Sequence, residues 1–140
     1  MSTISLLSSY EAILSLQSVC YSIITDQIHR GITKKQLVQF KDVLDITFSE
    51  LAGLLHVTDR TLYLKNNEDV LSETLADHAF SIAQIYSIVY NAFLNKKKAD
   101  RWMRLKSKAF GDKSAMELCK SIVGREAVAQ EIMRLRMGLY

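Results

Sequence analysis

The sequence has no proline and only five glycines among its 140 residues. These two residue types interrupt helices and mark most tight turns, so their scarcity favours helices along the whole chain. Hydrophobic residues make up 49% of the sequence and charged residues 24%, a balance that is ordinary for a globular protein with a real core. We therefore predict an all-α protein.

Thiols and long apolar runs are also scarce. Cys20 and Cys119 are a widely separated pair and do not suggest the disulfide framework of a small secreted domain. No apolar run is long enough to span a bilayer, and the first residues lack the basic region that opens a signal peptide. These absences predict a cytoplasmic protein whose two thiols are reduced and buried.

Sequence motifs typical of enzymes are missing as well. The three histidines, His29, His56 and His78, fall in different predicted helices and lack the spacing of a metal site. There is no glycine-rich phosphate loop, nucleophile elbow or zinc-protease motif. We expect no catalytic residues, no metal and no cofactor, and we expect the histidines to be surface residues or hydrogen-bonded core residues.

What the sequence does contain is the pattern of a helix-turn-helix over residues 48–66. Thr47 and Glu50 form a capping box that begins the first helix, and Thr58 can cap the second. His56 stands at the turn, where a positive φ is often required. The residues expected to face inward are Leu51, Ala52, Leu54, Leu55 and Leu62. The candidate DNA-binding residues are Thr58, Asp59, Arg60, Thr61, Tyr63 and Lys65. An ordinary αα-hairpin in a helical core is the alternative.

Charge is distributed unevenly around this pattern. The net charge is +3, but residues 1–30 carry −1, residues 31–95 carry −3 and residues 96–140 carry +7. Phosphate contacts supply most of the affinity of a DNA-binding protein, and the candidate helix-turn-helix lies in the acidic part. DNA binding therefore requires either avidity from a dimer or help from the basic segment. A charge run of this kind is also common on a solvated face.

The segments before and after the helix-turn-helix have helical periodicity. Apolar residues from Leu6 to Ile28 predict one long amphipathic helix that ends near Gly31, and this helix either dimerises or packs on its own chain. A second capping box at Thr33 begins the helix that precedes the helix-turn-helix. Ser72 begins a long helix whose apolar stripe favours core filling over a coiled-coil seam.

The C-terminal third predicts three short helices. The first begins at Lys96 and is expected to end near Phe110 and Gly111, the second is capped by Ser114, and Gly124 separates it from the third. We therefore expect three parts: residues 1–30 as an N-terminal helix and possible dimerisation element, residues 31–95 as a helix-turn-helix domain, and residues 96–140 as a small three-helix domain.

The C-terminal third also resembles a known family. The residues that carry the resemblance are Ala99, Trp102, Met103, the run Ala109-Phe110-Gly111, the run Ala115-Met116-Glu117-Leu118, Gly124, Val128, the run Ile132-Met133-Arg134-Leu135 and Gly138. Together they are similar to the toxin-binding domain of the Xre/MbcA/ParS antitoxins. In that family a helix-turn-helix lies directly upstream, as it does here, so the resemblance extends over residues 33–140.

The resemblance implies a function. It implies a non-catalytic antitoxin of a RES-Xre type II toxin-antitoxin system. Such an antitoxin blocks the active site of an NAD-consuming RES-domain toxin, and its helix-turn-helix represses the operon that encodes both proteins. A homodimer is consistent with this function. The candidate toxin-binding residues are Trp102, Phe110, Arg134, Arg136, Gly138, Leu139 and Tyr140.

Two other functions stay open at this point. One is a transcriptional regulator without a toxin partner, which would use the C-terminal unit to dimerise or to bind an effector. The other is a structural interaction protein with a degenerate helix-turn-helix, which the acidic charge of residues 31–95 favours and which would show no DNA binding even at low salt.

Overall fold

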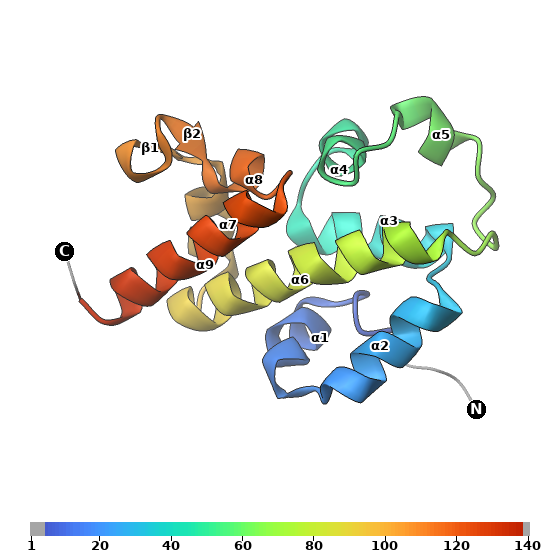
Figure 1. Cartoon of the computed structure of the whole chain (residues 1–140), viewed down its shortest axis with the longest axis horizontal. Helices are drawn as coiled ribbons and strands as arrows, with labels where there is room; N and C mark the ends of the chain where they lie inside the picture. Colours follow the sequence, from blue (N-terminus) through green and yellow to red (C-terminus); the bar gives the residue numbers. More distant parts are fainter. Residues whose placement is uncertain (1–4, 139–140) are drawn as a thin grey trace.

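The computed structural model describes residues 5–138, and within this range the fold is all-α except for one two-stranded hairpin (Figure 1). The elements follow in the order α1 (Tyr10–Leu14), 3-10 helix η1 (Ser15–Ser18), α2 (Tyr21–Arg30), α3 (Lys34–Leu44), α4 (Phe48–Leu54), α5 (Asp59–Tyr63), α6 (Glu73–Phe93), α7 (Lys96–Arg104), β1 (Lys106–Ser107), 3-10 helix η2 (Lys108–Phe110), β2 (Lys113–Ser114), α8 (Ala115–Leu118) and α9 (Ile122–Arg136).

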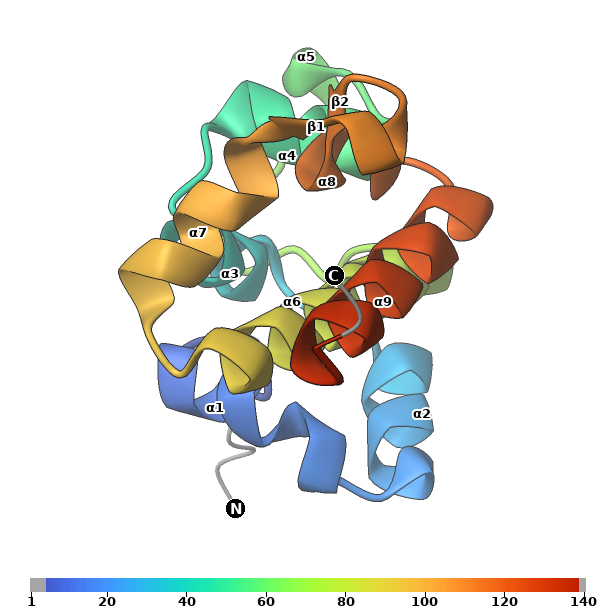
Figure 2. The ribbon, with the colours of Figure 1, turned by 90° about the vertical axis from the view of Figure 1, so that its left-hand side faces the viewer.

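The 21-residue helix α6 is the central element of the fold. It packs against the N-terminal helices on one side and against α7 and α9 on the other (Figures 1 and 2). A helix that is buried around most of its circumference must fill a core, since an amphipathic helix would bury only one stripe. The buried residues of α6 are Ala76, Ala79, Phe80, Ile82, Ala83, Ile85, Tyr86, Ser87, Val89 and Tyr90. Core filling by this helix is therefore confirmed.

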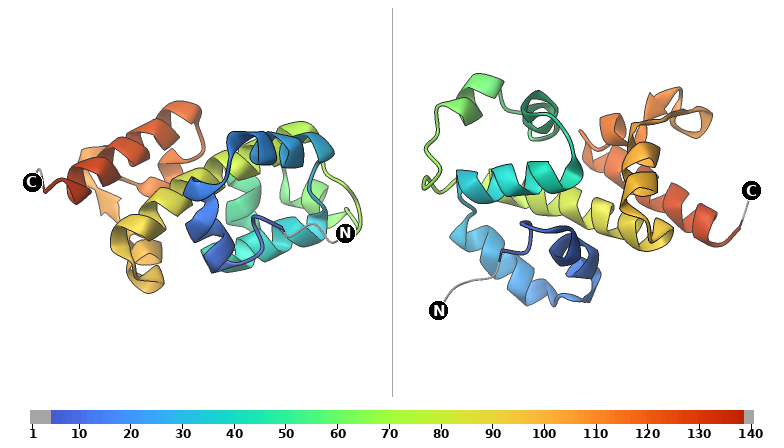
Figure 3. Two further views of the ribbon diagram at one scale, coloured as in Figure 1. Left: turned by 90° about the horizontal axis from the view of Figure 1, so that it is seen from below. Right: turned by 180° about the vertical axis from the view of Figure 1, so that it is seen from behind.

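The N-terminal segment is not the single long helix that its periodicity predicts. It is divided into α1, η1 and α2, and the chain is extended at Val19 and Cys20. The break lets the segment fold back, so that both pieces lie along α6 (Figure 3). This arrangement buries Leu7, Ile13, Leu16 and Ile24 in the core of the same chain.

The break also changes the environment of one thiol. Cys20 lies at the cap of α2 and is exposed, so the expectation of a buried thiol is wrong there. Cys119 is fully buried, as expected, and burial raises the pKa of its thiol to about 12. The neighbouring Tyr21, which the stripe placed on the apolar face, is 80% exposed.

The local features of the helix-turn-helix are those that the sequence predicts. Both capping boxes form, with Thr33 and Gln36 at the start of α3 and with Thr47 and Glu50 at the start of α4. His56 has a positive φ of 59°, so it makes the turn that glycine makes elsewhere. The five residues expected to face inward, Leu51, Ala52, Leu54, Leu55 and Leu62, are all buried. Figure 1 views α4 almost along its axis while α5 lies across the page, an inclination unlike that of an antiparallel αα-hairpin.

The C-terminal unit differs from the prediction in two places. Helix α7 ends at Arg104 and not near Phe110, because residues 106–114 form a hairpin in which Lys106 pairs with Ser114. Consecutive left-handed residues, Gly111 and Asp112, both with a φ of 65°, reverse the chain there. The hairpin was not predicted.

The second difference concerns Gly124, which does not separate two helices. Ser121 caps α9, and Gly124 lies inside its first turn. A Cβ at Gly124 would lie 1.8 Å from the carbonyl oxygen of Leu118, so only glycine lets α9 pass so close to α8.

Candidate partner-binding surfaces

The six candidate DNA-binding residues lie on α5 or within two residues of its ends, and all are exposed. Leu62, on the opposite side of the helix, has no exposed surface. The Thr58 hydroxyl accepts the backbone N–H of Thr61 at 3.1 Å and lies 2.8 Å from the Thr61 hydroxyl, so these two side chains cap the helix. Arg60 and Lys65 remain as the exposed cations of this surface.

The side chain of Lys34, on α3, binds the C-terminal end of α5, a contact that the sequence does not predict. Its Nζ donates to the carbonyl oxygens of Tyr63 at 3.3 Å and Lys65 at 2.7 Å, where a cation is favoured by the helix dipole. The same ammonium lies within 6 Å of the rings of Phe48 and Tyr63, which pack edge to face. Tyr63 is nevertheless 76% exposed, so its ring is available to a partner. A contact across some thirty residues leaves no local pattern in a sequence.

The candidate toxin-binding residues fall into two groups. Trp102 and Phe110 belong to an aromatic row in which the Trp102 ring lies 5.9 Å from both Phe93 and Phe110. Phe110 is buried and Trp102 half-buried, so both rings contribute to the core of the unit. Arg134, Arg136 and Gly138 are exposed at the end of α9. Leu139 and Tyr140 lie outside the described residues.

A shallow apolar groove lies beside the second group. It has a volume of about 240 Å³, runs between the end of α6 and α9, and is lined by Ala92, Phe93, Ile132, Leu135 and Arg136. Phe93 thus lines the groove and also packs against the ring of Trp102. Leu94, which follows α6 with a φ of 52°, is 77% exposed. Exposed apolar surface of this kind is typical of a partner-binding site.

The helix-turn-helix and the C-terminal unit meet at a polar contact between α4 and α7. The Arg104 guanidinium donates to both carboxylate oxygens of Glu50, at 2.9 and 3.0 Å, and to the carbonyl oxygen of Asp45 at 3.0 Å. The hydrogen bonds from Arg104 lower the pKa of the Glu50 carboxyl and Glu50 in turn raises the pKa of Arg104. Glu50 also accepts the N–H of Thr47, so the pair holds the first turn of α4.

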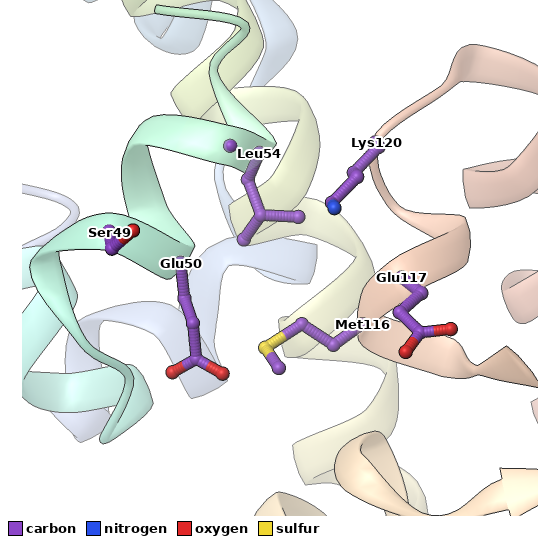
Figure 4. A pocket seen from close by; sticks show the side chains of 7 residues that line it. Ser49, Glu50, Leu54, Met116, Glu117 and Lys120 are labelled. Atoms are coloured by element: carbon purple, nitrogen blue, oxygen red, sulfur yellow. The ribbon is translucent and has the colours of Figure 1, made fainter. Parts of the chain in front are cut away.

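A pocket of about 220 Å³ lies next to this ion pair (Figure 4). Its lining residues are Ser49, Glu50, Gly53 and Leu54 from α4, and Met116, Glu117 and Lys120 from α8 and the turn after it. Lys120 crosses over α4 at Gly53, where its Nζ is 4.0 Å from the position that a Cβ would take. On the other side of the turn, the imidazole of His56 donates from Nε2 to the carbonyl oxygen of Lys120.

Next to the contact between His56 and Lys120 lies the buried side chain of Arg125. The Nε of Arg125 donates to the carbonyl oxygen of Cys119 at 2.8 Å, and its Nη1 lies 3.3 Å from the hydroxyl of Ser81 and 3.4 Å from Nδ1 of His78. Burial lowers the pKa of Arg125. Both His56 and His78 thus have hydrogen-bond partners, and within residues 5–138 no three His, Cys, Asp or Glu side chains are grouped as metal ligands.

The comparisons with known proteins identify the C-terminal unit. None of the described helices is both long enough and apolar enough to cross a membrane. No curated protein matches the chain. Residues 89–138 match the family model described as the antitoxin Xre/MbcA/ParS C-terminal toxin-binding domain. The match begins in the last turn of α6 and ends after α9, so it includes the aromatic row and the groove. Residues 89–138 are thus an antitoxin toxin-binding domain of the Xre/MbcA/ParS family.

Proposed function

We propose that the protein is the antitoxin of a RES-domain toxin that consumes NAD, that it blocks the active site of this toxin, and that it represses their shared operon through the helix-turn-helix. The observation that carries the proposal is the toxin-binding domain at residues 89–138. The protein contributes binding and no catalysis. Its proposed partners are the toxin, operator DNA and a second copy of itself.

The toxin contact is proposed for the end of α9 and the groove beside it. Arg134 and Arg136 are exposed there, and arginine pairs well with acidic groups of a partner. Leu135 and Phe93 line the groove together with Arg136 and supply apolar surface there. A pocket for NAD accommodates flat rings and a pyrophosphate, and we propose that residues 138–140, which follow α9, are the segment that enters it.

Removal of residues 138–140 tests this arrangement. Complex formation with the toxin and NAD consumption by the toxin are measured separately for the truncated and full-length proteins. Retained binding with lost inhibition supports entry of residues 138–140 into the active site. Full inhibition by the truncated protein means that the body of the domain, around Trp102 and Phe110, provides the block.

The DNA contact is proposed for the exposed surface of α5. Arg60 and Tyr63 are both exposed and come from adjacent turns, while Leu62 is buried beneath them. Arg60→Ala should cost about 1–3 kcal/mol of operator binding if the guanidinium contacts a base edge. Arg30→Ala is the matched control, because Arg30 is an exposed arginine at the end of α2 and belongs to neither helix of the helix-turn-helix. Equal operator affinity for the wild type and Arg60→Ala, with unchanged circular dichroism, contradicts the assignment.

A transcriptional regulator without a toxin partner is the competing function. The exposed surface of α5 supports DNA binding in either case, so that surface does not distinguish the two. Affinity purification of the tagged protein from its host, followed by identification of the bound proteins, does. Recovery of a RES-domain protein supports the antitoxin, and recovery of the chain alone supports the regulator.

A further inference from the structure

The segment from α7 to β2 carries a run of exposed cations, most of which have no acidic partner among the ion pairs of residues 5–138. Residues 96–114 contain eight basic and two acidic residues, and the structure describes all of them. Two of the cations are paired, Lys96 with Asp100 at 2.6 Å and Arg104 with Glu50. The six exposed cations that remain are Lys97, Lys98, Arg101, Lys106, Lys108 and Lys113. The last three belong to the hairpin, and we call them the hairpin lysines.

The hairpin and α5 lie on the same side of the molecule. Figures 1 and 2, which are turned by 90° from each other, both place β1, β2 and α5 at the top, above α6. Helices α4 and α8 lie between the hairpin and α5 (Figure 1), and Lys120, in the turn after α8, is exposed beside α4. The segments that carry the hairpin lysines, Lys120, Arg60 and Lys65 therefore lie on one side of the molecule.

Duplex DNA fits this arrangement of charge. Affinity for DNA comes largely from neutralised phosphates, and this contribution does not depend on sequence. The helix-turn-helix part carries −3 and offers few cations of its own. The hairpin adds three exposed lysines on the side of the molecule where α5 lies, and the one acidic residue of the hairpin is Asp112.

We propose that the hairpin lysines are a second DNA contact and bind phosphates of the same duplex that α5 reads. This proposal rests on the proposed DNA-binding function and deepens it, because it assigns part of the DNA affinity to the domain that also binds the toxin. The contact is sequence-independent, so a duplex of mixed sequence is a sufficient probe.

The test compares two triple variants with the same loss of charge. The first is Lys106→Gln, Lys108→Gln and Lys113→Gln. The control is Arg30→Gln, Lys97→Gln and Lys98→Gln, which removes exposed cations outside the hairpin, at the end of α2 and at the start of α7. Thermal unfolding verifies that both variants fold as the wild type does.

Binding to a labelled duplex of about 30 base pairs is followed by fluorescence anisotropy over a range of NaCl concentrations. For the hairpin variant we expect affinity to fall at least about tenfold at low salt, and the slope of log K against log salt to decrease by about 2–3, since each phosphate contact contributes about 0.9. For the control we expect affinity within about twofold of the wild type.

Three results would overturn the proposal. Unchanged binding by the hairpin variant would mean that the lysines only face solvent, and an equal loss in both variants would mean that net charge alone matters. Normal DNA binding by the hairpin variant together with lost toxin binding would assign the lysines to the toxin. If the wild-type protein binds no duplex even at low salt, the DNA-binding function itself fails, a result distinct from the other three.

Discussion

The ion pair between Glu50 and Arg104 allows a quantitative prediction about the contact between the helix-turn-helix and the toxin-binding domain. The perturbation is a double-mutant cycle with Glu50→Gln, Arg104→Gln and both together. Glutamine is the right replacement at position 50, because it too serves in a capping box and leaves the start of α4 intact. The cycle therefore isolates the interaction of the two charges from the helix cap.

The magnitude follows from geometry and exposure. The contact is bidentate, with both N···O distances at or below 3.0 Å, which is the strongest form of an arginine–carboxylate pair. Solvent screens it in part, because the Arg104 side chain is 44% exposed and the Glu50 side chain 29%. We therefore expect a coupling energy of about 1–1.5 kcal/mol, between the values typical of exposed pairs and of buried pairs.

The pH dependence of this coupling has a defined direction. Hydrogen bonds from Arg104 lower the pKa of Glu50 in the folded protein below its unfolded value. Such a group stabilises the fold above the unfolded pKa, about 4.3, and the stabilisation is lost as pH falls through the folded pKa. Urea denaturation at neutral pH should show the full coupling, and denaturation at a pH well below 4 should show almost none. A coupling below about 0.3 kcal/mol at neutral pH, or one that persists in acid, would refute the reasoning.

Three further predictions concern other parts of the chain. Gly53→Ala should stabilise the protein by about 0.5–1 kcal/mol, because a Cβ at position 53 meets only the flexible end of the Lys120 side chain. Gly124→Ala should destabilise the protein by at least about 2 kcal/mol, because a Cβ there clashes with the backbone of Leu118. Chemical denaturation measures both free energies of unfolding, and equal effects of the two substitutions would be inconsistent with the packing. Iodoacetamide should modify Cys20 in the native protein and Cys119 only after unfolding, because the first thiol is exposed and the pKa of the second is raised to about 12; mass spectrometry that finds both modified natively would contradict this. If the exposed face of α2 dimerises, Tyr21→Ser should lower the mass measured by light scattering, and an unchanged dimer would exclude this face.

Sequence reasoning succeeded where the determining contacts are local. An N-cap side chain accepts the backbone N–H three positions further on, so Thr33, Thr47 and Ser72 mark helix starts that the structure reproduces. The positive φ of His56 is another local property, set by the need for a turn between two short helices. The family of the C-terminal unit was also predicted correctly, from the spacing of its aromatic, glycine and arginine residues.

The features that were missed depend on contacts between distant residues. The N-terminal segment has apolar residues on both sides of residue 19, so its spacing does not indicate the extended Val19 and Cys20, which separate η1 from α2 and let both pieces pack on α6. Lys34, Arg104 and Arg125 contact residues far away in sequence (Lys65, Glu50 and Ser81), so nothing beside them in the chain indicates these partners. The remaining site assignments, on α5 and at the end of α9, stay predictions until the experiments above are done.

The position of α6 has a consequence for how the protein unfolds and how it can be divided. The toxin-binding domain begins at residue 89, inside this helix. The Tyr90 hydroxyl donates a hydrogen bond to the Asp100 carboxylate of α7 at 2.9 Å. A fragment that starts at residue 96 would lose this partner together with the buried face of Val89, although the chain connection there looks like a natural boundary. Amide hydrogens on both sides of residue 95 should therefore exchange in one cooperative opening, and recombination between relatives would preserve the fold only if it transferred α6 along with the toxin-binding helices.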